Sequence, residues 1–287
     1  MNRHELTEVQ TRRIWKDLSH LTGEETQGRL SGTIGARKAA SYLEQQLTSS
    51  GYETSFMPVD VPALRLTGRP TLLVGEHAFR HRMDFAELNA ATSGGTVEGK
   101  LLVLRDGDDI DAAELVDKIV LISERPDGLD VRATAEAAAN AGVKALLVEH
   151  GEPKWFHKSP NGGRNTRIPV LRVRQSVAEP LVRLNGEPAF VDLPLENRTL
   201  ACQNVLGFLK GNPRATETLV LIAHYDHVGD DPGGMRFPGA IDNAAGVAIL
   251  LGLARELATR KESLPFHVLV AFLTGEESGM VGARQLS

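Results

Sequence analysis

The chain has little of several features that would place it in a specialised class of protein. Its single cysteine, Cys202, cannot form a disulfide within the chain. The formal net charge is only −5, so neither nucleic acid nor an anionic membrane is expected as a partner. The first eight residues contain no apolar run. We therefore expect no secretory signal and no transmembrane span, which favours a cytoplasmic location, or secretion if the N-terminus has been trimmed.

What the sequence does contain is typical of a globular protein with two kinds of region. The chain has 287 residues, a length that suffices for two domains or one large one. Its composition, 41% hydrophobic and 24% charged, is that of an ordinary globular protein. The first region begins with helical periodicity over residues 5–22 and 36–49, followed by a strand pattern over 52–59. From about residue 62, short strands separated by Gly, Pro and Asp turns predominate.

The first pattern returns after residue 196. Apolar strands are predicted over 203–209, 218–223 and 266–273, and a helix over 243–259. The simplest organisation is an α/β domain built from residues 1–60 and 196–287 and interrupted by a β-rich domain at 61–195. Within the interruption, a strand, an Ala-rich helix and a second strand over residues 118–149 predict a parallel crossover unit.

Three clusters of chemically active side chains follow apolar segments in the last quarter of the chain. His224 and Asp226 come at the end of one predicted strand, Asp242 precedes the predicted helix, and Glu276 and Glu277 follow the last predicted strand. Open parallel sheets bind ligands at the carboxyl ends of their strands. Histidine and carboxylate side chains are the ones that bind zinc and transfer protons.

Two of the three clusters also have a simpler interpretation. Asp242 would serve well as the N-cap of the helix, and the two glutamates as solvated acids. His227 follows the first cluster and is expected to line the site without being a ligand. The occurrence of all three clusters in one chain favours a shared metal site.

These residues resemble the bacterial zinc aminopeptidases with two co-catalytic metal ions, a family that includes glutamate carboxypeptidase II and the transferrin receptor. The matching segments read His224-Tyr225-Asp226, Gly239-Ala240-Ile241-Asp242-Asn243 and Gly275-Glu276-Glu277-Ser278-Gly279. The interruption resembles a protease-associated domain in its strand at 117–122 and its helix and strand at 135–148.

The resemblance implies a three-layer α/β/α zinc-exopeptidase domain and removal of N-terminal residues from peptides. It implies that His224 binds one zinc ion, that Asp242 bridges two, and that Glu277 binds the second. Glu276 would be the general base, and Asp226 would orient His224. Peptides are the implied substrates.

The resemblance also implies an Asp ligand and a His ligand well downstream of Glu277. The ten residues that follow Glu277 contain neither. We therefore expect an incomplete catalytic domain that is inactive without those ligands. We also expect the strand at 266–273, or its neighbour, to be an open edge of the sheet through which the chain self-associates. Two alternatives remain: a non-catalytic scaffold that binds through the protease-associated domain, and a related zinc carboxypeptidase or deacylase.

Overall fold

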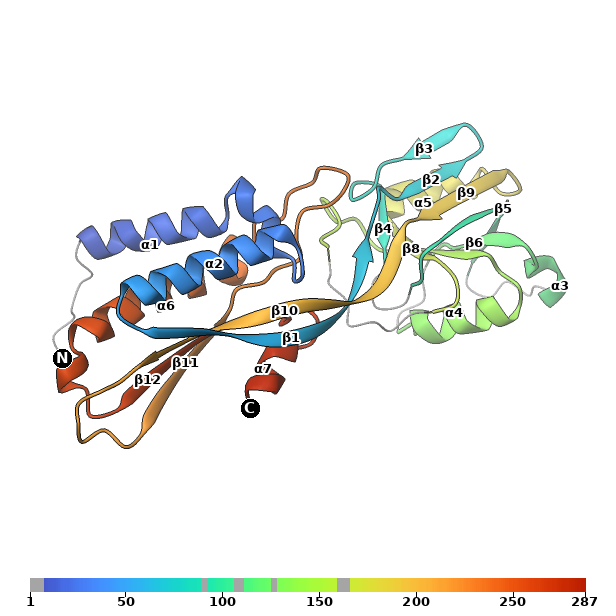
Figure 1. The fold of residues 1–287 in the computed structure, drawn as a ribbon. Coiled ribbons are helices and arrows are strands. Elements are labelled where there is room, and N and C mark those ends of the chain that lie inside the picture. The colour runs from blue at the N-terminus through green and yellow to red at the C-terminus, as the bar shows by residue number, and fades with distance from the viewer. Residues whose placement is uncertain (1–7, 89–91, 106–110, 125–127, 159–165) are drawn as a thin grey trace. The chain divides into compact units, whose positions relative to one another are not determined.

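The computed structural model describes residues 8–88, 92–105, 111–124, 128–158 and 166–287. They form two compact units (Figure 1). Unit 1 comprises residues 1–62, 199–230 and 234–287, and unit 2 comprises residues 63–198 and 231–233. The sequence had placed the corresponding boundaries after residues 60 and 195. None of the described helices is both long and apolar enough to span a bilayer.

Unit 1 contains a four-stranded mixed sheet in the order β1-β10-β12-β11. β12 runs antiparallel to β10 and parallel to β11. The strands are β1 (Glu53–Leu66), β10 (Leu195–Leu209), β11 (Thr218–His224) and β12 (His267–Leu273). The helices are α1 (Glu8–Leu21), α2 (Ile34–Ser49), α6 (Ala245–Thr259) and the short α7 (Val281–Leu286), with a 3-10 segment, η1, at Glu24–Arg29 and a π-type turn, η2, at Ala240–Ala244.

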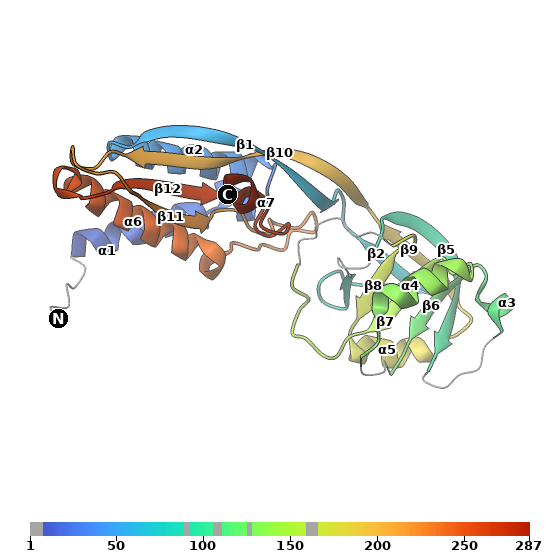
Figure 2. The same ribbon diagram turned by 90° about the horizontal axis from the view of Figure 1, so that it is seen from below.

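The layers of unit 1 follow from the apolar faces of its helices. Leu43 and Leu47 of α2 and Leu251 of α6 are fully buried against Val270 and Phe272 of the central strand β12. Figures 1 and 2 show α1, α2 and α6 on one face of the sheet and α7 on the other. This is the α/β layering that the sequence predicted, with only one short described helix in its third layer.

Unit 2 is built on an eight-stranded sheet in the order β3-β2-β9-β5-β6-β7-β8-β4. The strands β5 to β8 are parallel, and the others pair antiparallel. β6 and β7 flank α4, which confirms the predicted crossover unit. The elements are β2 (Thr71–Val74), β3 (His77–Phe79), β4 (Phe85–Glu87), β5 (Gly95–Leu104), α3 (Ala112–Leu115), β6 (Lys118–Ile122), α4 (Val131–Asn140), β7 (Ala145–Glu149), β8 (Val170–Val173), α5 (Gln175–Val182) and β9 (Pro188–Leu193).

A buried network of charges lies inside unit 2. Arg82 donates to Glu87 Oε1 at 2.5 Å and to Asp231 Oδ2 at 2.5 Å, and all three side chains are 1% exposed. His81 Nε2 lies 2.9 Å from Glu87 Oε2, and Lys158 Nζ lies 3.2 Å from Asp231 Oδ1. These ion pairs explain why residues 231–233 belong to unit 2, which the sequence did not predict.

The network makes the stability of unit 2 sensitive to acid. Burial alone would raise the pKa of Glu87, but the hydrogen bond from His81 and the charges of Arg82 and His81 outweigh it and lower the pKa from 4.5 to about 2. Since the folded-state pKa lies below the unfolded one, this stabilisation is complete above about pH 4.5 and is lost as the pH falls toward 2. The lost contribution is about 3 kcal/mol.

We expect the Glu87→Gln variant to abolish this part of the acid dependence and to destabilise unit 2 at neutral pH, because Arg82 loses a buried counter-charge. Urea unfolding at pH 7, 4.5 and 3 measures both effects. Glu98→Gln, at an exposed position of the same unit, is the matched control. An acid dependence of Glu87→Gln equal to that of the wild type would contradict the assignment.

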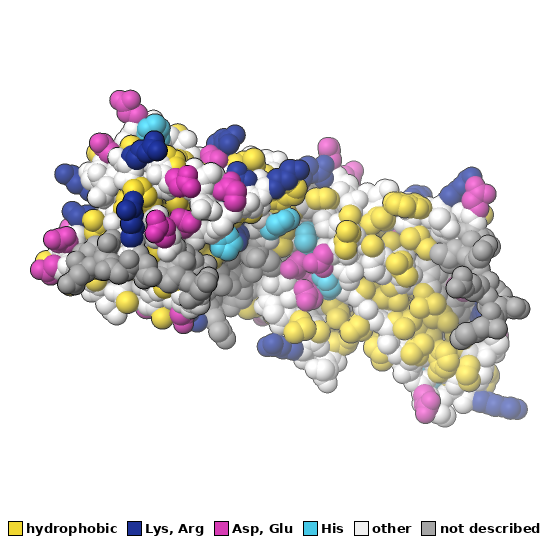
Figure 3. Space-filling model, turned by 180° about the vertical axis from the view of Figure 1, so that it is seen from behind, with side chains coloured by type: hydrophobic (Ala, Val, Ile, Leu, Met, Phe, Trp, Pro, Cys, Tyr) yellow, Lys and Arg dark blue, Asp and Glu magenta, His cyan; other side chains and the backbone are white. Residues whose placement is uncertain are grey.

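One edge of the unit 1 sheet is apolar and open. β12 lies between β10 and β11, so the expected open edge is β11, the neighbour of the strand 266–273. On β11, Val220 is 50% exposed and Ile222 is 59% exposed, and on α6, Ile249 is 60% exposed. Figure 3 shows hydrophobic side chains gathered over unit 1, at the right of that view. No described strand pairs with the outer side of β11.

We propose that this edge mediates self-association of the chain, because unpaired strand edges and exposed apolar surface favour pairing with a second chain. Sedimentation analysis at tens of micromolar is expected to show a dimer that Ile222→Lys disrupts. Trp15→Lys, which changes an exposed apolar residue of α1, is expected to leave it intact. A wild-type monomer under these conditions would refute the proposal.

Candidate metal centre

The two parallel strands of unit 1 bring distant segments of the chain together. His224, the last residue of β11, lies opposite Leu273, the last residue of β12. The main chain stays paired one residue further, where Tyr225 N donates to Leu273 O at 2.9 Å. The segments that follow the two strands therefore leave the sheet at the same edge. This geometry places the His224 cluster beside Glu276 and Glu277.

Asp242 joins this group from the turn before α6. Its Oδ1 lies 3.2 Å from His224 Nε2. Two ligands of one tetrahedral zinc ion, each bound at about 2.0–2.1 Å, lie about 3.3 Å apart, so this spacing fits a shared ion. The helix begins at Ala245, and no side chain caps it, so the N-cap interpretation of Asp242 is wrong. The Asp242 side chain is 62% exposed and available for coordination.

Asp226 is buried behind His224 and bound by several donors. Its carboxylate accepts hydrogen bonds from the hydroxyl of Ser31 at 3.1 Å and from the main-chain N–H of Glu276 at 3.3 Å. His224 Nδ1 lies 3.3 Å from the Asp226 carbonyl oxygen and 3.7 Å from Oδ1. The carboxylate is thus at ion-pair distance from the ring, while the closer acceptor is the main-chain carbonyl. Both contacts leave Nε2 of His224 directed at Asp242.

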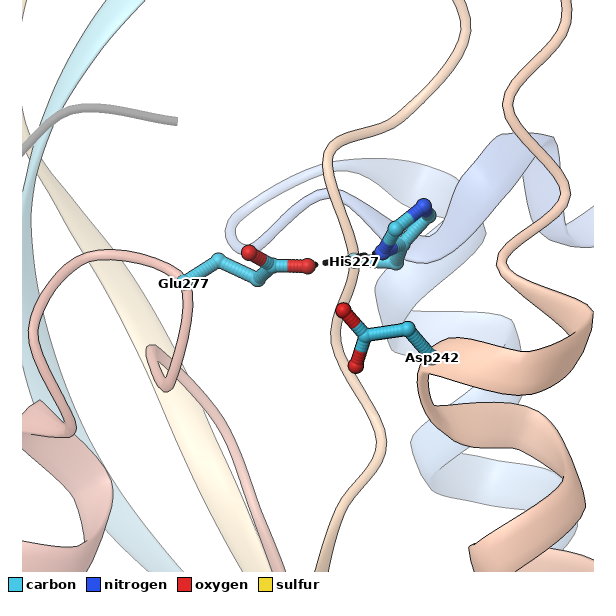
Figure 4. A group of neighbouring side chains, drawn as sticks. All are labelled: His227, Asp242 and Glu277. Carbon is cyan, nitrogen blue, oxygen red and sulfur yellow. Dashed lines mark hydrogen bonds and ion pairs between the residues drawn. The ribbon is translucent and has the colours of Figure 1, made fainter. Parts of the chain in front are cut away.

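His227, Asp242 and Glu277 form a second group that shares Asp242 (Figure 4). One potential ligand atom from each lies within 4.8 Å of those from the other two. His227 Nδ1 and Glu277 Oε1 are 2.7 Å apart, which is a hydrogen bond and is shorter than the spacing of two ligands on one ion. The sequence placed His227 at the edge of the site. In the structure it is a hydrogen-bond partner of Glu277. The spacing His224-x-x-His227 is the feature of the sequence that could have indicated a role for His227 in the site.

Glu276 differs from its neighbour Glu277 in its surroundings. Its carboxylate makes no hydrogen bond or ion pair with the residues that the structure describes, although the residue is half-buried. Partial burial raises its pKa, and the negative charges of Glu277, Asp226 and Asp242 raise it further against the opposing effect of His224. A carboxylate that is free of partners and has a raised pKa is suited to accept a proton.

The electrostatics of the site favour a bound cation. Burial would lower the pKa of His224, but the hydrogen bond and charge of Asp226, with the charges of Glu276 and Asp242, outweigh it and raise the pKa. Four carboxylates from three separate segments of the chain thus act on one or the other of the two imidazoles: Asp226, Asp242 and Glu276 on His224, and Glu277 on His227. Imidazole and carboxylate donors at these spacings match the ligand chemistry of zinc.

Imidazoles and carboxylates gathered at the carboxyl ends of parallel strands, on an α/β unit, define a candidate metal-dependent hydrolase. Residues 204–287, which carry all of these side chains, match the sequence profile described as Peptidase family M28. The chain is also 30% identical over 175 residues to the aminopeptidase YwaD of Bacillus subtilis, a match that covers 60% of this chain and 35% of YwaD. A probable zinc metalloprotease of Pyrenophora teres f. teres is 33% identical over 105 residues, which are 34% of this chain and 22% of that protein.

Solved structures show the same fold. The zinc aminopeptidase BSAP from Bacillus subtilis superposes with a TM-score of 0.70 at 24% identity, covering 96% of this chain and 64% of that one. An aminopeptidase from Aneurinibacillus sp. strain AM-1 gives a TM-score of 0.66 at 21% identity, with 96% and 65% covered. The chain thus shares the mixed α/β fold of these solved structures, and it spans about a third of the length of YwaD.

Proposed function

We propose that the chain carries the catalytic centre of a zinc-dependent aminopeptidase, which removes N-terminal residues from peptides. The observation that carries this proposal is the position of Asp242, which lies 3.2 Å from His224 and also belongs to the group with His227 and Glu277. The named activities of YwaD and of the Bacillus subtilis structure support the same substrate class.

The donors suggest a division of roles. His224 and Asp242 would hold one zinc ion, and Asp242 and Glu277 a second, with His227 hydrogen-bonded to Glu277 or taking part as a further donor. When bound, zinc acts as a Lewis acid on water and on the scissile carbonyl. Asp226 would keep the His224 ring in place through the contacts at 3.3 and 3.7 Å.

Glu276 is proposed as the general base. Its free, half-buried carboxylate would take a proton from the attacking water and then deliver it to the leaving amine. Glu277, the adjacent acid, points instead to His227 and Asp242 (Figure 4). The two neighbouring glutamates thus have separate roles, one in proton transfer and the other in metal binding.

The family resemblance supports two further proposals, one about the missing metal ligands and one about unit 2. A downstream Asp and a downstream His, from another segment or a partner chain, would complete the ligand sets. Unit 2 would be the protease-associated domain, a binding module inserted into the catalytic domain. Relatives of this architecture include the non-catalytic transferrin receptor, so the free base Glu276 is the feature that favours an enzyme over a scaffold.

Hydrolysis of aminoacyl anilides by the purified 287-residue chain tests the proposal. Hydrolysis with added zinc that stops on chelation and is lost in Glu276→Ala would support the proposal, and would mean that water or a neighbouring subunit takes the place of the downstream ligands. N-acyl amino acids and peptides with a blocked N-terminus, offered in parallel, test the deacylase and carboxypeptidase alternatives. A folded wild-type chain with no activity above Glu276→Ala on any of these would favour the scaffold.

A further inference from the structure

The polar, Gly-rich stretch before α2 has an unusual backbone. Gln27, Gly28 and Arg29 follow one another with φ values of +48°, +66° and +52°. This left-handed region is costly for residues that carry a Cβ, and such strain gathers at functional sites. Gly28 is required there, because a Cβ would lie 2.4 Å from the carbonyl oxygen of Phe237. Contacts with the surrounding structure must therefore stabilise the left-handed backbone of this turn, which Gln27 and Arg29 do not favour by themselves.

The turn is paired with the loop that carries the site. The main-chain N–H groups of His227, Gly229 and Asp230 donate to the carbonyl oxygens of Arg29, Gly28 and Gln27 at 3.2, 3.0 and 3.0 Å. This pairing runs directly past His227, the partner of Glu277. The left-handed backbone presents three successive carbonyl groups to the same loop.

The Arg29 side chain donates hydrogen bonds to both ends of the loop at residues 225–239. Nε donates to the carbonyl of Tyr225 at 2.7 Å, between His224 and Asp226 in the chain. Nη1 and Nη2 donate to the carbonyls of Pro238 and Gly239 at 2.8 and 2.9 Å, just before the turn that holds Asp242. One planar guanidinium thus sets the separation of two chain segments that supply ligands.

Arg29 does this as a fully buried cation that forms no ion pair with any carboxylate among the residues that the structure describes. Its exposed fraction is 0%, and the described hydrogen-bond acceptors are main-chain carbonyls. Burial lowers its pKa to about 10, while the charges of Asp226, Asp242 and Glu277 act to raise it. The guanidinium is therefore protonated at neutral pH, and its charge lies within the field of the acidic cluster.

Ser31, in the stretch before α2, connects that stretch to the segment of Asp226 and to the segment of Glu276. Its hydroxyl donates to Asp226 Oδ2 at 3.1 Å and accepts from Gly275 N at 3.2 Å, and Thr274 Oγ1 lies 3.1 Å away. Ser31 is 2% exposed. One buried hydroxyl thus joins the carboxylate behind His224 to the main chain just before Glu276.

We propose that residues Gln27–Ser31, here called the clamp segment, position the ligands of the zinc site by holding the segments of His224, Asp242 and Glu277 at their binding separations. The inference rests on the proposed function, since it assigns the clamp segment a role in metal binding. Arg29 and Ser31 are positioning residues: they touch the main chain and Asp226, and neither would contact zinc or substrate.

Zinc affinity and hydrogen exchange of the 287-residue chain test the clamp segment together. Ser31→Ala and Arg29→Lys each remove hydrogen bonds while keeping size or charge, and we expect zinc binding by calorimetry to weaken by about 10–100-fold, as for other supports of metal ligands. Cobalt, used as a spectroscopic substitute, should show an altered visible absorption in both. Ser50→Ala, which removes a hydrogen bond to Gln46 at the end of α2, and Arg255→Lys, which removes hydrogen bonds from α6 to Asp17 and Gln46, make the same chemical changes outside the clamp segment and are the controls.

The outcomes separate the two proposals. Equal zinc affinity and cobalt spectra in wild type, Ser31→Ala and Arg29→Lys would overturn the clamp segment while leaving the zinc site intact. A wild-type chain that binds no zinc would overturn the proposed function. Amide hydrogen exchange in the metal-free protein would then be the test of the clamp segment. In the protein without added metal, we expect the amides of His227, Gly229 and Asp230 to lose protection in Arg29→Lys but not in Arg255→Lys. Unchanged protection would refute the clamp.

Discussion

Replacing Glu276 by glutamine is expected to lower kcat for aminoacyl-anilide hydrolysis by about 10²–10⁴-fold, the usual contribution of a general base. Glutamine keeps the shape of the side chain but cannot accept the proton from the attacking water. Because the Glu276 carboxylate makes no contact with the other described site residues, zinc affinity should not change. Steady-state kinetics at saturating zinc, together with calorimetric titration of the metal, measure the two quantities separately.

Glu277→Gln is the matched comparison, since it makes the same chemical change one residue along the chain. Glu277 hydrogen-bonds to His227 at 2.7 Å and belongs to the candidate ligand group. We therefore expect this variant to lose zinc affinity, with activity recovering in part at higher zinc concentration. If both variants lost zinc affinity equally, or if Glu276→Gln kept full activity, the division of roles between the two acids would be wrong.

Replacing Asp242 by asparagine is expected to weaken zinc binding by at least about 100-fold, more than the loss of an outer support for a ligand usually costs. Asp242 lies 3.2 Å from His224 and also belongs to the group with His227 and Glu277, so both proposed ions depend on it. The amide keeps the shape and removes the negative charge. Hydrolysis should fall below detection at micromolar zinc.

Asp60→Asn changes an exposed aspartate on β1 of the same unit and controls for the general effect of losing a charge. The melting temperature of Asp242→Asn without added zinc should equal that of the wild type or exceed it, because Asp242 is mostly exposed and sits among other acids. A variant that binds zinc as tightly as Asp60→Asn would remove Asp242 from the site.

Much of this architecture was predictable because its signals are local. The strands β11 and β12 are short apolar runs, and each ends within one residue of its predicted boundary. His224, Asp242 and Glu277 stand out because polar ligating side chains directly follow such runs. Parallel pairing then brings the two strand ends together, so a one-dimensional pattern sufficed to group residues that are about 50 positions apart.

The parts that the sequence did not reveal depend on tertiary contacts. Nothing local in Gln27 or Arg29 favours a left-handed backbone, which is stabilised by pairing with the loop at 227–230. The predicted helix start at residue 243 was two residues early, because Asp242 and Asn243 take non-helical conformations beside His224. Asp231 joins unit 2 through buried ion pairs with residues some 75 to 150 positions earlier in the chain.

The most direct test of the central claim is anomalous diffraction at the zinc edge from crystals of this chain grown with zinc. The account predicts a peak about 2.0–2.2 Å from His224 Nε2 and from an oxygen of Asp242, the usual zinc–ligand distances. At higher occupancy, a second peak should lie against Asp242 and Glu277. Zinc bound only at other residues, or no peak at the strand ends despite saturating zinc, would contradict the assignment of this site.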